Sequence, residues 1–183
     1  PYANWSGTYG WLDWPGGGSD SQGFARWMVN ARAEDGSRPA RVLETHPTWV
    51  DGGRIEGEFS TESIDFREGD YLYARVGFLE GAGAGAVRFT VTFEPTVVSM
   101  IYPKTTFVSF SATPGGPGVG YANYRVLVAE VEDMYDGQLQ TLRVDLAEVL
   151  EQAGTNYGTF RLEVDANGAS AQDWAIWADA RLE

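Results

Sequence analysis

Apolar and polar residues alternate along most of the chain, and this pattern predicts β-strands. The segment from Val87 to Glu94 is the clearest case, because Val, Phe, Val and Phe occupy every second position. Successive side chains of a strand point to opposite faces, so such alternation indicates a strand with one buried face. Comparable runs, separated by turns rich in Gly, Asp and Asn, cover residues 24–31, 41–45, 54–59, 63–66, 71–79, 97–112, 124–132, 138–146, 158–164 and 172–182.

Helical signals are scarce. Residues 147–153 form the one credible short helix, and Gly154 follows where a left-handed residue often ends a helix. The glycine-rich residues 81–85 precede a strand instead of a helix, which predicts a hairpin connection and not a phosphate-binding loop. We therefore expect an all-β protein, an antiparallel two-sheet β-sandwich with ten to twelve strands.

Two regions are expected to differ in organisation. Residues 1–23 are rich in aromatic residues and glycine without a regular period, so we expect an extended N-terminal arm, and residues 24–183 are expected to form a single β-sandwich domain. The closing stretch has large side chains on both faces, which predicts a central strand buried on both sides. Trp174 shares its face with small and apolar residues and is assigned to the core, whereas Trp177 is assigned to an outer face.

The closing segments Asp173–Ala175 and Trp177–Leu182, with the upstream segments Tyr73–Phe78, Val87–Val91, Leu142–Leu146 and Phe160–Val164, form a set of strand-like motifs over roughly residues 71–182. In this spacing they resemble the strands of jelly-roll carbohydrate-binding modules of the NPCBM type, and the two closing segments are similar to the final strand of those modules. The resemblance implies a jelly-roll-like β-sandwich fold and, for function, the binding of a glycan.

Charge and composition exclude several partners. The 183 residues include 26 acidic and 13 basic ones, giving a net charge of −13. Such a field repels nucleic acids and anionic membrane surfaces, because phosphate binding needs clustered cations. No apolar run reaches the length of a membrane-spanning helix, and no cysteine is present. We expect a secreted or cell-surface protein, either a mature chain or an excised module.

Exposed aromatic residues are the candidate ligand-binding groups. Indole and phenol rings can stack on the C–H faces of sugars, and the candidates are Trp5, Trp11, Trp14, Trp49 and Tyr121. For the residues in the N-terminal arm, the competing interpretation is that the rings pack over the sandwich as an additional layer. The two interpretations differ in whether the aromatic side of the arm faces solvent or packs against the sandwich.

The sequence lacks a recognisable catalytic constellation. His46 is the single histidine and precedes Pro47, so a structural hydrogen bond is the favoured role. A glycosidase would need two carboxylates about 5–5.5 Å or about 6.5–9.5 Å apart, a separation that a sequence does not report. The default candidates for such a pair are Glu56, Glu58, Glu80 and Asp173.

No cofactor is expected, although calcium remains open. Acidic turns with glycine recur, and the oxygen ligands that they could offer belong to Asp133, Asp136, Asp165 and Asn167. Ordinary turn chemistry explains the same residues, since Asp and Asn favour turns.

Two functions from different classes follow. The leading hypothesis is a non-catalytic extracellular module that binds glycans or mediates adhesion. The alternative is a structural subunit that assembles with copies of itself into a surface layer or filament, through the N-terminal arm and the sheet edges.

Overall fold

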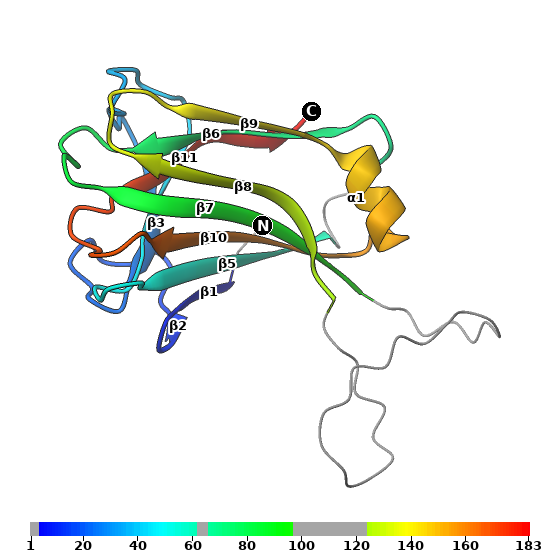
Figure 1. Ribbon diagram of the computed structural model, residues 1–183, viewed down its shortest axis with the longest axis horizontal. Helices are drawn as coiled ribbons and strands as arrows, with labels where there is room; N and C mark the ends of the chain where they lie inside the picture. Colours follow the sequence, from blue (N-terminus) through cyan, green and yellow to red (C-terminus); the bar gives the residue numbers. More distant parts are fainter. Residues whose placement is uncertain (1–3, 62–65, 97–123) are drawn as a thin grey trace, which may run out of the picture.

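The computed structural model describes residues 4–61, 66–96 and 124–183, so Tyr121 and the predicted strand at 97–112 lie outside the described residues. Within them are eleven strands and one helix (Figure 1). The elements are β1 (Asn4–Gly7), β2 (Gly10–Leu12), β3 (Phe24–Met28), β4 (Val42–His46), β5 (Arg54–Ser60), β6 (Tyr71–Phe78), β7 (Ala86–Pro95), β8 (Val126–Met134), β9 (Gln140–Asp145), α1 (Leu146–Ala153), β10 (Gly158–Ala166) and β11 (Ala175–Leu182).

The strands form two antiparallel sheets, and the predicted sandwich is confirmed. Sheet A has the order β2-β1-β5-β10-β7-β8, and sheet B has the order β3-β4-β11-β6-β9. The sheets lie face to face in Figure 1, with α1 at one end of the sandwich. The strand β11 is central in sheet B, as its two apolar faces predict. Neighbouring strands from distant parts of the sequence therefore build one core.

The predicted short helix is confirmed as α1. The side chain of Asp145 accepts a hydrogen bond from Ala147 N at its start, and Gly154 closes it with a φ of 68°. This left-handed conformation suits glycine, which has no Cβ to clash. In the described part of the chain, no helix is long and apolar enough to cross a membrane.

Residues 4–12 belong to sheet A, so an extended arm over residues 1–23 is not confirmed. β1 and β2 form a hairpin, and β1 also pairs with β5. Trp5 is only 2% exposed, because its ring lies over Gly57 on β5 and stacks on Trp14. The rings of this region thus pack against the sandwich, and the segment proposed to dock on another copy pairs within its own sheet.

The assignment of the two closing tryptophans is wrong and must be reversed. Trp177 is 1% exposed and meets Phe89 edge-on, with ring centroids 5.1 Å apart between the sheets. The other face of β11 is also buried, but Ile176 packs against Ala31 and Ala33 of the β3–β4 connection. Ile176 is therefore covered by the β3–β4 connection and not by the opposite sheet, whereas Trp174 and Ala180 are exposed.

Candidate functional site

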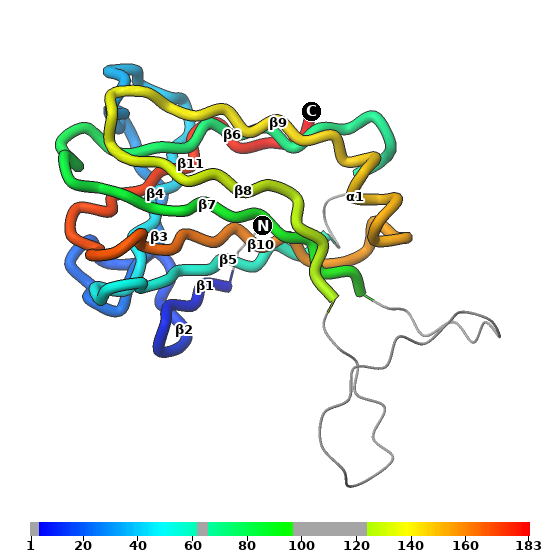
Figure 2. Tube along the Cα trace, viewed as in Figure 1, coloured from blue at the N-terminus to red at the C-terminus, as the bar shows by residue number. Residues whose placement is uncertain are grey.

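Two loops meet at the end of the sandwich opposite α1. Residues 47–53 connect β4 to β5, and residues 167–174 connect β10 to β11 (Figure 2). Gly52 N donates a hydrogen bond to Gly168 O over 2.9 Å, and Ala166 N donates to Gly53 O over 2.8 Å. These bonds fix the two loops against each other.

A pocket of about 440 Å³ lies between the two loops. It is lined by His46, Trp49, Val50, Asp51, Ala169, Ser170, Ala171, Gln172 and Trp174. Trp49 is 48% exposed and Trp174 is 36% exposed, so each loop contributes one accessible indole. A concave, mostly apolar site with a few polar groups is typical of small-molecule binding.

The loop that carries Trp174 is fastened to the connection between β6 and β7. The Gln172 side-chain oxygen accepts a hydrogen bond from Ala84 N, and Asp173 Oδ1 accepts one from Ala86 N, both over 3.0 Å. Asp173 is completely buried, and burial raises its pKa to about 6. Asp173 therefore supports the loop from beneath and does not line the pocket.

His46 contributes an imidazole to the pocket lining from the end of β4. It is 3% exposed, stacks on Phe24 with centroids 5.4 Å apart, and lies 5.6 Å from the Trp49 ring. Nδ1 donates to Pro47 O over 2.7 Å, because a carbonyl oxygen can only accept. Burial lowers the pKa of His46, which favours the neutral ring at pH 7.

The structure separates the aromatic residues that the sequence grouped together. Trp49 lines the pocket, whereas Trp5, Trp11 and Trp14 do not. The expectation of exposure is wrong for Trp5, which is buried under the β1–β2 hairpin, and Trp14 is half-buried against it. Trp11 is 73% exposed on β2 at the edge of sheet A. Among the described candidates, only Trp49 belongs to this pocket.

Of the nine residues that line this pocket, the sequence predicts only Trp49 as a binding residue, and Trp174 and His46 are the two aromatic ones that it assigns to other roles. The alternation places Trp174 in the core because it shares a strand face with small and apolar residues, yet the strand begins one residue later, at Ala175. Gln172 has a φ of 65°, a left-handed conformation that turns the chain before the strand. The sequence favours a structural hydrogen bond for His46. The structure shows that bond, and it also places His46 in the pocket lining.

The calcium candidates do not form a shared site. In residues 4–61, 66–96 and 124–183, no three acidic or histidine side chains are arranged to hold a metal ion. Asp133 lies near Glu34, and burial followed by this neighbouring charge raises the Asp133 pKa to about 6. Glu34 itself accepts hydrogen bonds from the backbone N–H groups of Asp136 and Gly137. The acidic turn at 133–137 is thus held by a carboxylate and backbone donors.

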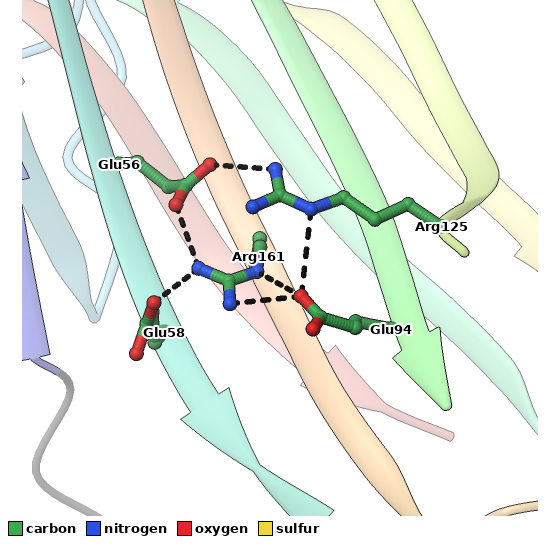
Figure 3. A network of polar contacts seen from close by, with 5 residues as sticks. All are labelled: Glu56, Glu58, Glu94, Arg125 and Arg161. Carbon is green, nitrogen blue, oxygen red and sulfur yellow. Dashed lines mark hydrogen bonds and ion pairs between the residues drawn. The ribbon is translucent and has the colours of Figure 1, made fainter. Parts of the chain in front are cut away.

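The carboxylates proposed as glycosidase candidates are engaged elsewhere. Glu56 and Glu58 both contact Arg161 on the outer face of sheet A, within a network that includes Glu94 and Arg125 (Figure 3). Glu80 pairs with Arg32 over 2.9 Å. Asp173 is enclosed beneath its loop. None of the four lines the pocket that the described residues form.

No protein-family model matches the chain, and no curated protein matches it. Among solved structures, one similar chain is CBM51 from Clostridium perfringens GH95 in complex with methyl-galactose, at 17% identity and a TM-score of 0.49, covering 85% of this chain and 80% of that chain. Another is TmCBM61 in complex with beta-1,4-galactotriose, at 12% identity and a TM-score of 0.44, covering 98% and 87%. Both of these solved structures are carbohydrate-binding modules.

Proposed function

We propose that this chain is a non-catalytic carbohydrate-binding module and that a sugar ring occupies the pocket between residues 47–53 and 167–174. The observation that carries this proposal is the pair of accessible indoles, Trp49 and Trp174, which line one pocket from two different loops. Aromatic faces provide large apolar contacts at fixed geometry, while Asp51, Ser170 and Gln172 supply polar groups for hydroxyls.

Rigidity of the pocket supports binding. The loops are joined to each other through Gly52 and Gly168, and the second loop is anchored through Gln172 and Asp173. A site that is ordered before the ligand arrives loses less conformational entropy on binding. A modest contact area can therefore give useful affinity.

A secreted or cell-surface location belongs to this proposal, because glycans of walls, matrices and cell surfaces are met there. The net charge of −13 agrees with a neutral partner. The similarity of the chain to carbohydrate-binding modules, one recorded with methyl-galactose, suggests which sugars to test first.

The test compares three tryptophan variants on a glycan array and by affinity electrophoresis. Trp49→Ala and Trp174→Ala should each weaken binding at least tenfold, as truncation of a central aromatic contact does. Trp11→Ala is the matched control, because it removes an indole that is exposed but distant from the pocket lining. Failure of the wild-type chain to bind any glycan, or equal losses in all three variants, would contradict the proposal.

A further inference from the structure

The His46 ring presents an unpaired nitrogen that is not enclosed by protein. Nδ1 is occupied by Pro47 O, so in the neutral ring the proton is on Nδ1 and Nε2 can only accept. Nε2 has no hydrogen-bond partner among the described residues. The fully enclosed polar atoms without a partner do not include Nε2, so this atom is not completely covered by protein. His46 is a lining residue of the pocket between the two loops, so Nε2 is the acceptor that this side chain can offer there.

The ring is held firmly in this orientation. Phe24 stacks on it at 27° between planes, and Trp49 contacts it at 47°. The hydrogen bond to Pro47 fixes the rotation of the imidazole within this stack. These contacts hold the remaining acceptor, Nε2, in one orientation.

Charges near this acceptor are negative or already paired. Asp51, on the β4–β5 loop, is the one charged side chain in the lining formed by described residues, which includes no Lys or Arg. On β3, Arg26 lies 5.1 Å from the Phe24 ring, but it pairs with Glu44 of β4 over 2.6 Å. The loop 167–174 contributes no charge to the lining, since Asp173 is turned beneath it.

We infer that His46 is a specificity-determining residue of the pocket: Nε2 accepts a hydrogen bond from a hydroxyl of an uncharged sugar, and sugars that carry a carboxylate are rejected. This inference rests on the glycan-binding function proposed above. A hydroxyl donates readily to an imidazole nitrogen, whereas a carboxylate brings only acceptors. In this lining a sugar carboxylate would meet the lone pair of Nε2 and the negative charge of Asp51, with no Lys or Arg to balance its charge. This repulsion disfavours acidic sugars and so makes the pocket selective for neutral ones.

The first experiment measures selectivity with matched ligands. The wild-type chain is applied to an array that carries neutral oligosaccharides beside the same oligosaccharides capped with sialic acid or ending in a uronic acid. We expect at least tenfold weaker binding of each acidic member than of its neutral counterpart. Equal or tighter binding of the acidic members overturns the inference.

The second experiment locates the hydrogen bond. The neutral array oligosaccharide bound most tightly is compared with its singly O-methylated derivatives, each lacking one hydroxyl donor, on wild type and on His46→Phe. The variant keeps an aromatic ring in the stack but removes the acceptor, and it should bind about tenfold more weakly. One O-methyl derivative should bind wild type more weakly than the parent oligosaccharide does. The same derivative and the parent should bind His46→Phe equally well, because the hydroxyl and His46 are the two partners of one hydrogen bond.

His46→Gln serves as the conservative variant, because its amide oxygen is an acceptor. It should recover part of the affinity lost in His46→Phe, whereas a purely structural role of His46 would make the two variants lose affinity in parallel with their thermal stability. Binding by His46→Phe that equals wild type overturns the inference alone and leaves the proposed function standing. A wild-type chain that binds no glycan removes both.

Discussion

The Glu163 side chain of β10 lies directly across the strand pair from Glu56 of β5 and is hydrogen-bonded to it. Burial, followed by this hydrogen bond, raises the pKa of Glu163 to about 8. Burial opposes ionisation of Glu56 as well, but the bond from Glu163 and the charges of Arg125 and Arg161 hold the Glu56 pKa below its usual value. At neutral pH, therefore, Glu163 is the protonated partner and its hydroxyl donates to the Glu56 carboxylate.

This pair should make stability fall as the pH rises towards 8. The pKa of Glu163 is about 8 in the folded protein and 4.5 in the unfolded chain, so the folded state holds this proton more tightly. The stabilisation that results is complete below pH 4.5 and is lost as the pH rises through about 8. The slope is at most about 1.4 kcal/mol per pH unit. Urea denaturation at pH 6.5 and pH 8 should therefore show a loss in wild type that Glu163→Gln lacks.

That pH interval is chosen to isolate Glu163. Asp133 and Asp173 have raised pKa values of about 6, so their similar losses occur mainly at lower pH. Glu151→Gln, a change at an exposed position on α1, is the control and should retain the wild-type difference. Identical slopes in wild type and Glu163→Gln would contradict the assignment of the proton.

The closing tryptophans should differ in their contributions to stability. Trp177→Ala removes a ring enclosed between the sheets against Phe89 and should lower the free energy of unfolding by about 3–5 kcal/mol. Trp174→Ala removes a partly exposed ring at the pocket and should cost less than about 2 kcal/mol. Chemical denaturation followed by circular dichroism measures both, and similar losses in the two variants would be inconsistent with the burial described.

Arg161 should be a stabilising cation, because three carboxylates share it. Nη1 lies 2.7 Å from Glu56 and also contacts Glu58, and Nη2 lies 2.9 Å from Glu94. Arg161→Met leaves this acidic group with only Arg125 and should cost about 3 kcal/mol at pH 7, as for other largely buried ion pairs.

The same variant should lose much less stability at pH 4, where carboxylates begin to be protonated. Arg32→Met is the matched control, because Arg32 pairs with Glu80 at a half-exposed site and should change stability by less than about 1 kcal/mol. Thermal melts of both variants at the two pH values measure this, and a loss for Arg161→Met that is independent of pH would argue against a charge effect.

Gly57 should be intolerant of a side chain because the Trp5 ring occupies the space above it. A Cβ atom at Gly57 would lie 2.6–2.8 Å from three atoms of that ring, closer than real contacts allow. Gly57→Ala should therefore displace the β1–β2 hairpin and cost about 1–3 kcal/mol. At Gly17 an added Cβ meets open space, so Gly17→Ala should be nearly neutral in the same denaturation assay. Equal effects would contradict this packing.

Most of the sandwich could be predicted from the sequence because its strands have one apolar face and one more polar face. The alternation in β7 marks inward and outward residues without reference to any other segment. The β1–β2 hairpin escaped prediction because its strands are four and three residues long, too short to display a period. Its place in the sheet depends on Gly57, which accepts the Trp5 ring from more than fifty residues away.

The pocket was less predictable because it is assembled from two loops that are distant in sequence. Trp49 could be recognised as an aromatic residue in an irregular segment. Trp174 could not be recognised, because the apolar and polar pattern of the strand continues through it. The chain nevertheless turns at Gln172, which has a left-handed conformation, and the strand begins only at Ala175. The availability of His46 Nε2 depends on the Pro47 carbonyl and on Phe24 and Trp49 packing around the ring.

The central position of β11 also determines when this protein can fold. β11 follows every other described strand in the sequence, yet it lies between β4 and β6 in sheet B. Until it emerges from the ribosome, β3–β4 and β6–β9 remain two separate pairs, each with an unpaired inner edge. Closing the sheet joins Ala175 to Thr45, 130 residues earlier, and such long-range pairing slows folding. Between the synthesis of β6 and that of β11, the nascent chain therefore carries two unpaired strand edges, on β4 and β6, which must not pair with each other or with another chain.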